Sequence, residues 1–100
     1  MPRVMFTISY TIKPDRRDDY LSLVGKMKSH LAAAGKEYSV YEAKAKPNHF
    51  TEIFVTNSLE EFDALDEDQD ETVEGIVSEL EEFVDEGSKK YTTLVETELG

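Results

Sequence analysis

The sequence predicts an α+β fold of the split βαβ, ferredoxin-like type, with a four-stranded antiparallel sheet and helices on one face. The first observation is a period-two alternation near the N-terminus, which is typical of a strand with one apolar face. The apolar positions of this strand are Val4, Phe6, Ile8, Tyr10 and Ile12. The second is helical spacing of apolar residues over 20–34, and the third is the overall order β-α-β-β-α-α-β.

Proline and glycine mark the limits of the first helix. Pro14 ends the first strand, and Asp15 is in position to cap a helix. We expect this helix to run from about Asp15 to Ala34 and to stop at Gly35. Two strand-like segments follow, 37–45 and 49–56, separated by the turn sequence KPN, so they predict a hairpin.

Two capping patterns predict the second helical region. Ser58 followed by Glu61 is a capping box, and Asp68 followed by Glu71 repeats it. A helical apolar stripe then extends to Val84 and predicts a helix that ends by Gly87. The segment 91–99 supplies the last strand.

The composition indicates one small acidic domain over residues 1–100. The net charge is −11, and residues 51–100 contain seventeen acidic but only two basic residues. Such a chain repels phosphate backbones and anionic lipids, so we expect no nucleic-acid or membrane partner. No apolar run is long enough for a membrane span or a signal peptide, and we therefore expect a cytoplasmic protein.

One layer of helices covers only one face of a sheet, yet both faces of this one carry apolar side chains. An uncovered apolar face of this kind marks an interface. We therefore expect a homodimer in which two sheets pack face to face. The residues assigned to the interface are Met5, Phe50 and Phe54.

The acidic segment between the second and third predicted helices imitates a calcium-binding loop, with Asp66, Asp68 and Asp70 at alternate positions. A calcium loop needs glycine at its sixth position and a bidentate glutamate at its twelfth. This chain has Glu71 and Val77 there, so we expect no metal site. With no cysteine in the chain, a thiolate site is also excluded.

The order of predicted elements and short motifs along the whole chain resembles that of the antibiotic-biosynthesis-monooxygenase-like group of the dimeric α+β barrel superfamily. The resemblance rests on the stretches TISYTIKPDRRDDYLSLVGKM, KPNHFTEIFVTNSLEEFDAL and YTTLVETEL. It implies a dimeric barrel with a pocket in each subunit between sheet and helices. It also implies, among other activities, cofactor-independent oxygenation of hydroxylated aromatic compounds, and we accordingly expect no cofactor.

Candidate site residues follow from the strands. For catalysis they are His49, Glu52, Tyr10 and Tyr41, because histidine, a buried carboxylate or tyrosine can exchange protons with a phenol. For the ligand pocket they are Phe6, Ile8, Tyr10, Ile53 and Phe62. The alternatives are a solvated histidine at a strand end, packing tyrosines, and a Glu52 paired with Lys44 or Lys46.

Two functions remain open. The chain has no tryptophan, and the Asn, Trp and His of the haem-degrading members of the resembled group have no counterparts. This favours a protein that binds a small apolar or aromatic ligand and is related to the cofactor-independent monooxygenases of aromatic or polyketide-like compounds. The alternative is an active oxygenase or isomerase that uses tyrosine, His49 or Glu52.

Overall fold

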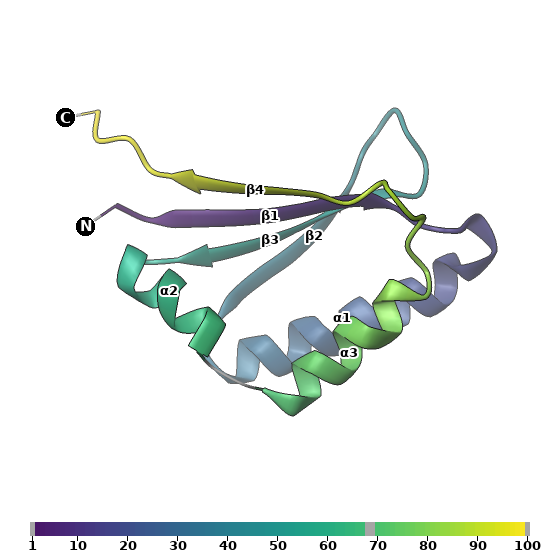
Figure 1. Cartoon of the computed structure of the whole chain (residues 1–100), viewed down its shortest axis with the longest axis horizontal. Helices are drawn as coiled ribbons and strands as arrows, with labels where there is room; N and C mark the ends of the chain where they lie inside the picture. The colour runs from purple at the N-terminus through teal and green to yellow at the C-terminus, as the bar shows by residue number, and fades with distance from the viewer. Residues whose placement is uncertain (1, 68–69, 100) are drawn as a thin grey trace.

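The computed structural model describes residues 2–67 and 70–99 and confirms the predicted fold class. Its strands are β1 (Val4–Thr11), β2 (Glu37–Glu42), β3 (His49–Thr56) and β4 (Lys90–Val95). Its helices are α1 (Arg17–Ala33), α2 (Leu59–Glu67) and α3 (Glu71–Glu81), with a 3₁₀ turn, Pro14–Arg16, before α1. The sheet is antiparallel with the order β2-β3-β1-β4, and the helices lie on one side of it (Figure 1).

The helix ends agree with the sequence only in part. The first helix begins at Arg17 and not at Asp15, and its N-cap, Arg16, makes no side-chain hydrogen bond, so the predicted Asp15 cap is wrong. Gly35, just after α1, adopts a φ of 76°, the left-handed conformation that glycine accepts at a helix end. The Glu61 amide donates to Ser58 Oγ at 3.2 Å, and the Glu61 carboxylate accepts from the Asn57 amide instead of the Ser58 amide. The N-cap of α3 is Asp70 and not the predicted Asp68, and it accepts from the amides of Thr72 and Val73.

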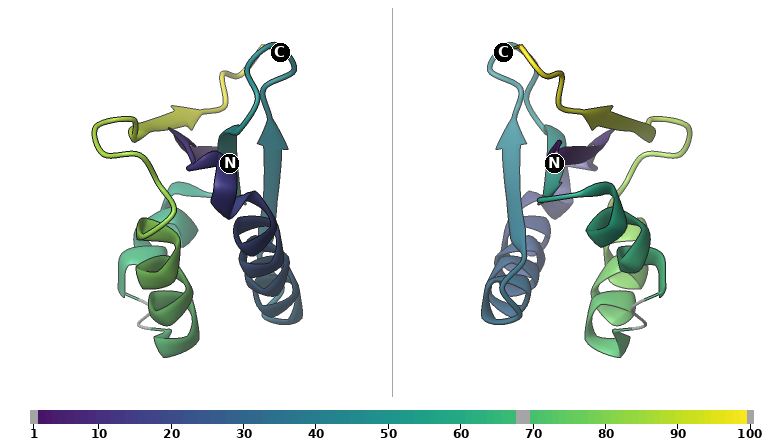
Figure 2. Two further views of the ribbon diagram at one scale, coloured as in Figure 1. Left: turned by 90° about the vertical axis from the view of Figure 1, so that its right-hand side faces the viewer. Right: turned by 90° about the vertical axis from the view of Figure 1, so that its left-hand side faces the viewer.

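The core lies between the sheet and the helices α1 and α3. Seen end-on, these two helices lie side by side on one side of the sheet, and the opposite face of the sheet has no helix over it (Figure 2). The buried cluster contains Tyr10, Ile12, Tyr20, Leu23, Val24, Met27, Leu31, Tyr38, Phe50, Ile76, Leu80, Phe83 and Val84. Within α1, Leu23 is buried, whereas Leu21 is 41% exposed.

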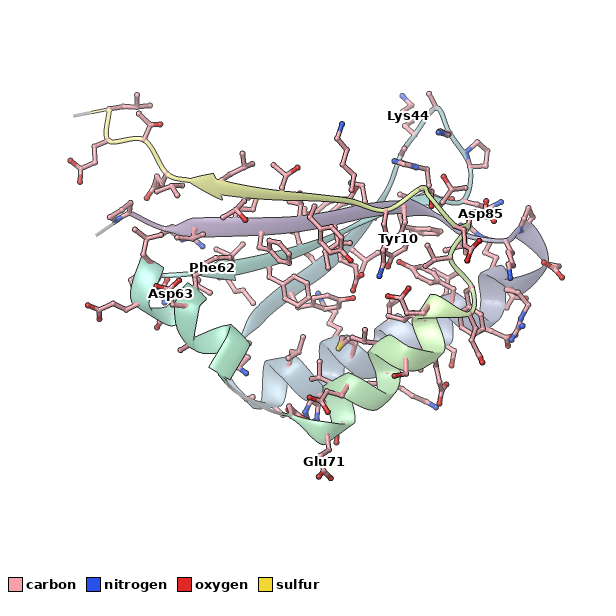
Figure 3. The ribbon with its side chains drawn as sticks, in the orientation of Figure 1. Tyr10, Lys44, Phe62, Asp63, Glu71 and Asp85 are labelled. Carbon is pink, nitrogen blue, oxygen red and sulfur yellow. The ribbon has the colours of Figure 1, made fainter. Side chains whose placement is uncertain are left out.

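The register of β3 corrects the assignment of Phe50 and Phe54 to a subunit interface. Phe50 pairs with Tyr10 and Phe54 with Phe6, so both phenylalanines lie on the same sheet face as Tyr10, whose side chain is on the side of the helices (Figure 3). Phe50 is 3% exposed and lies 4.6 Å from the ring of Tyr20. Only Met5, at 38% exposure, lies on the uncovered face as expected.

An ion pair joins α1 to the β2–β3 hairpin. Both guanidinium nitrogens of Arg17 donate to the Glu42 carboxylate, at 2.5 and 2.8 Å, and Arg17 also donates to the side-chain oxygen of Asn48. Asn48 adopts a φ of 64° in the tight turn, and its amide donates to Glu42. The hydrogen bond from Arg17 and the bond from the Asn48 amide lower the pKa of Glu42 to about 2.

Replacing Glu42 with glutamine should lower the melting temperature at neutral pH, because the Arg17 pair is lost. The folded-state pKa of Glu42 lies below its usual value of 4.5, so its contribution to stability is complete above about pH 4.5 and disappears as the pH falls to about 2. The wild type and Glu42→Gln should therefore converge at the acidic end. Thermal melts by circular dichroism across this range check the prediction, and a constant difference down to pH 2 would contradict it.

Candidate functional site

A buried carboxylate surrounded by tyrosine hydroxyls lies at the centre of the helix-covered sheet face. Glu52 is only 5% exposed. The Tyr38 hydroxyl donates to Glu52 Oε1 at 2.6 Å, and the Tyr10 hydroxyl donates to Oε2 at 2.8 Å. The hydroxyls of Tyr10 and Tyr20 are themselves 2.7 Å apart. Both carboxylate oxygens are thus hydrogen-bonded, as a buried charge requires.

Three neighbouring strands bring this group together. Glu52 on β3 is directly opposite Ile8 on β1 and Val40 on β2. Tyr10 lies two residues after Ile8 and Tyr38 two residues before Val40, so both occupy diagonal positions that long side chains can span. Tyr20 reaches the group from the first turns of α1, so a helix and three strands fix its geometry.

Burial makes Glu52 and its tyrosine partners weaker acids than the free side chains. Burial raises the pKa of Glu52, although the hydrogen bonds from Tyr38 and Tyr10 partly oppose the increase. Burial, with the nearby Glu52, raises the pKa of Tyr10 and of Tyr38 far above that of free tyrosine, so both remain hydroxyl donors. A carboxylate with a raised pKa binds a proton more readily, which suits it to act as a base.

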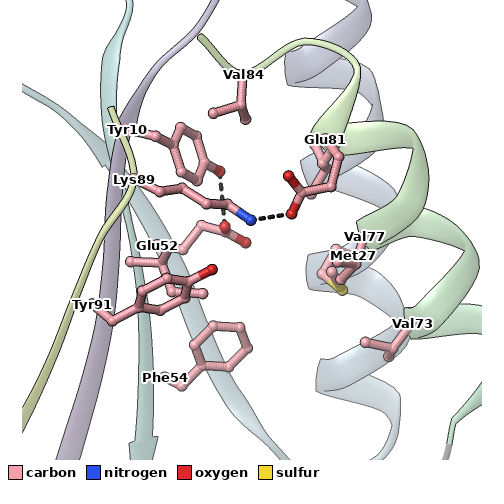
Figure 4. Close-up of a pocket in the computed structure, with 12 residues that line it drawn as sticks. Tyr10, Met27, Glu52, Phe54, Val73, Val77, Glu81, Val84, Lys89 and Tyr91 are labelled. Atoms are coloured by element: carbon pink, nitrogen blue, oxygen red, sulfur yellow. Dashed lines mark hydrogen bonds and ion pairs between the residues drawn. The ribbon is translucent and has the colours of Figure 1, made fainter. Parts of the chain in front are cut away.

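Glu52 forms part of the wall of a cavity of about 240 Å³ between the sheet and α3 (Figure 4). Most of the wall is apolar. Its residues are Ile8, Tyr10, Met27, Glu52, Phe54, Val73, Val77, Leu80, Glu81, Val84, Lys89 and Tyr91. Tyr10, Met27 and Glu52 are buried, whereas Val77 and Tyr91 are 40% and 57% exposed. The cavity therefore opens to solvent between α3 and β4 and ends at Glu52.

An ion pair lies at this opening. The Lys89 side chain extends from the residue before β4 and contacts the carboxylate of Glu81, the last residue of α3 (Figure 4). Its ammonium also lies 5.7 Å from the centre of the Tyr91 ring. Both charged side chains keep solvent contact, with side-chain exposures of 27% for Lys89 and 49% for Glu81.

The structure brings together only part of the predicted catalytic set. Glu52 and Tyr10 meet, and Glu52 pairs with tyrosines instead of Lys44 or Lys46. His49 is paired with Thr11 on the uncovered face, where its Nδ1 lies 3.1 Å from the Thr11 hydroxyl oxygen. Tyr41 also lies on that face and is 62% exposed.

Only some of the residues predicted for the ligand pocket lie in the cavity wall. Ile8 and Tyr10 line the cavity. Phe6 and Phe62 contact each other, with ring centres 5.8 Å apart, and Phe6 stacks on Tyr91 at 6.2 Å, so they lie beside the cavity wall. The prediction that Ile53 lines the pocket is wrong, because Ile53 pairs with Thr7 on the opposite face of the sheet.

Sequence reasoning missed Tyr20 and Tyr38 as partners of Glu52, and Lys89 and Glu81 at the opening. The available signal for Lys89 was charge, because residues 51–100 contain only Lys89 and Lys90 as basic residues. A lysine isolated in such an acidic half has a choice of carboxylate partners. The sequence alone does not say which one it contacts.

In the part of the acidic connection before α3 that the structure describes, no side chains are grouped to bind a metal ion. Asp70 accepts from two amides of α3, and its Oδ2 lies 2.6 Å from His30 Nε2. Asp68 lies outside the described residues, and so does the side chain of Asp66. Across residues 2–67 and 70–99, no group of three His, Cys, Asp or Glu side chains is arranged to hold a metal ion. Within the same ranges no helix is long and apolar enough to cross a membrane.

Solved structures with the same architecture identify the fold. A putative antibiotic biosynthesis monooxygenase from Caulobacter crescentus CB15 superposes with a TM-score of 0.81 at 12% identity, covering 97% of this chain and 92% of that one. A conserved protein from Methanosarcina mazei Go1 gives 0.79 at 16% identity, covering 97% and 95%. An antibiotic biosynthesis monooxygenase gives 0.73 at 15% identity, covering 97% and 99%. The chain has the antibiotic-biosynthesis-monooxygenase-like fold.

No protein-family model and no curated protein matches the sequence. At identities of 16% and below, the structural likeness establishes the fold and not the reaction, since one fold supports many functions. Function must therefore be argued from the cavity and its side chains.

Proposed function

We propose that this protein binds a small aromatic compound bearing a hydroxyl group, with Glu52 as the polar anchor at the inner end of the cavity. The observation that carries the proposal is a buried carboxylate in the wall of a mostly apolar cavity. Apolar walls with a few convergent polar groups are the usual form of a small-molecule site. A buried carboxylate within reach of a ligand hydroxyl both selects that hydroxyl and can accept its proton.

The size of the cavity limits the ligand. Its volume of about 240 Å³ lies just below the roughly 300–1,000 Å³ of typical ligand sites. One aromatic ring or a fused pair therefore fits better than an extended polycyclic molecule. Phe54 and Tyr91 are ring partners along the wall.

A catalytic function is the second candidate, and Glu52 is the specific reason for it. Removing the proton from a phenol makes the ring electron-rich, and such a ring can react with O₂ without a cofactor. The putative monooxygenases that share the fold support this reading. In that case Glu52 is the general base, and Tyr10 and Tyr38 hold its carboxylate in place.

Binding of 1-naphthol, followed by its fluorescence, tests the proposal. We expect saturable binding to the wild type and at least tenfold weaker binding to Glu52→Leu, which removes the anchor. Glu52→Gln keeps the shape and a carbonyl acceptor but not the basicity, so it should retain part of the affinity. Equal affinity in all three proteins would contradict the proposal.

An oxygen electrode separates the two functions with the same compound. A protein that only binds naphthol should leave the oxygen uptake of the buffer unchanged. Protein-dependent uptake that disappears in Glu52→Gln would establish the catalytic alternative.

A further inference from the structure

We propose that Lys89 breaks its ion pair with Glu81 when a ligand binds and stabilises the oxyanion of that ligand. The cavity thereby selects compounds with an acidic phenol or enol hydroxyl over their neutral ethers. This inference rests on the proposed function of the cavity. In the step considered, the ligand O–H bond breaks and its proton moves to a carboxylate oxygen of Glu52. The electron pair stays on the ligand oxygen, so no oxidant or reductant is needed.

The charges that line the cavity make Lys89 the partner for such an anion. The ionisable wall residues are Glu52 from β3, Glu81 from α3, Tyr10 from β1, Tyr91 from β4 and Lys89 from the connection before β4. Lys89 is the single cation among these lining residues. When Glu52 becomes neutral by accepting a proton, the negative charge that it held is transferred to the ligand. An oxyanion in an apolar cavity needs a compensating cation or a hydrogen-bond donor.

Lys89 and Glu52 are close enough to influence each other. The positive charge of Lys89 acts to lower the pKa of Glu52, and the negative charge of Glu81 acts to raise it. In Figure 4 the Lys89 side chain extends toward α3 and lies, in this view, between the side chains of Tyr10 and Glu52. Glu52 and Lys89 both line the cavity, so a ligand hydroxyl at Glu52 lies in the same cavity as the Lys89 side chain.

The existing partner of Lys89 is suited to release it. The Glu81 carboxylate is half-exposed and is well solvated without the lysine. Exposed ion pairs of this kind contribute little to stability, because water solvates the separated charges. A ligand oxyanion inside the cavity is less hydrated than Glu81, so it gains more from the ammonium than Glu81 loses.

The competing explanation is purely structural, namely that the Lys89–Glu81 pair holds α3 against β4. The two explanations predict different effects on ligand binding when Lys89 and Glu81 are replaced one at a time. If the pair is a tether, removing either member loosens the cavity and changes binding in the same direction. If Glu81 competes with the ligand for Lys89, removing the lysine weakens recognition of the anion, whereas removing the glutamate strengthens it.

The probes are 4-nitrophenol, which absorbs visible light when ionised, and 4-nitroanisole, its methyl ether, which has no proton to lose. Dissociation constants for both are measured by equilibrium dialysis in a mildly acidic buffer, where most free nitrophenol is protonated. The quantity compared is the preference, defined as the anisole constant divided by the phenol constant. The absorbance of the bound nitrophenol reports its ionisation directly.

We expect the wild type to prefer the phenol and to bind it as the phenolate. Lys89→Met should reduce the preference about tenfold, the effect of one pKa unit on the bound phenol, and should diminish the phenolate band. Glu81→Gln should increase the preference severalfold. The matched controls are Lys90→Met, which removes the same charge from the uncovered sheet face, and Glu79→Gln, which removes an exposed carboxylate from α3. Neither should change the preference.

The inference is overturned if Lys89→Met keeps the wild-type preference, or if Lys89→Met and Glu81→Gln shift it in the same direction. In either case a retained preference of the wild type for the phenol over the anisole leaves the proposed function of the cavity intact. If the wild type binds neither probe, the cavity is not a site for small aromatic compounds, and both proposals are refuted. Thermal melts of all four variants accompany the measurement, so that a change in folding is recognised as such.

Discussion

Phe50→Asp is expected to unfold the protein at room temperature. The Phe50 side chain is 3% exposed and packs between the ring of Tyr20 and the guanidinium of Arg17, at 4.6 and 5.4 Å. Loss of a buried phenylalanine costs about 3–5 kcal/mol, and an unpaired buried charge adds several more. A small domain is stable by roughly 5–15 kcal/mol, so the combined loss consumes most or all of its stability.

Circular dichroism and a proton–nitrogen correlation spectrum measure this result. We expect loss of the cooperative melt and collapse of the amide dispersion. Phe50→Leu is the control, because it keeps an apolar side chain at the same position and should remain folded with a lower melting temperature. A folded but monomeric Phe50→Asp would instead return this residue to a subunit interface and contradict the register of β3.

The order of the elements was predictable because each rests on a local signal. The alternation of β1 predicted which of its residues face the helices, and Val4, Tyr10 and Ile12 are buried there. The φ of 76° at Gly35 agrees with its predicted role after α1. Local signals were weaker for α3, because Phe83 and Val84 continue the apolar stripe although the helix ends at Glu81. The two residues are buried by the turn that leads to β4, where Val84 forms a bridge with Ile12.

The faces of β3 were not predictable from the sequence, because both are apolar. Phe50 and Phe54 alternate with Ile53 and Val55, and the polar Glu52 made the inward face look like the outward one. Only the pairing with β1 and β2 decides that Glu52 is buried. The compensation for its burial comes from Tyr10, on β1, and Tyr38, on β2, which are distant in sequence. A buried polar group whose partners lie on other strands therefore leaves little local signal.

The corrected register also changes which residues belong to the uncovered face. Its apolar side chains are Met5, Ile53, Val55 and Leu94, and serine, threonine, Glu37, Tyr41, His49 and Lys90 surround them. Met5 and Leu94 are 38% and 51% exposed in the single chain. An exposed apolar strip of this kind, here near the end of the sheet where β1 begins, favours association with a partner. A two-fold axis would place the strip of one chain against that of a second copy.

We therefore expect the protein to be a dimer in solution, joined through the uncovered sheet face. A specific interface buries about 1,600 Å² in total, and at about 25 cal/mol per Å² of its apolar part the gross gain is large against the entropy lost on association. Two chains of charge −11 repel each other, but physiological salt screens charges beyond about 8 Å. Light scattering should give twice the 11.4 kDa of one chain.

Ile53→Asp should give a folded monomer, because its charge lies on the sheet surface and not in the core, unlike that of Phe50→Asp. Thr7→Asp, at the residue paired with Ile53, should have the same effect, since it places a charge on the same face. A monomeric wild type, or an Ile53→Asp variant that remains dimeric, would show that this face does not join two copies.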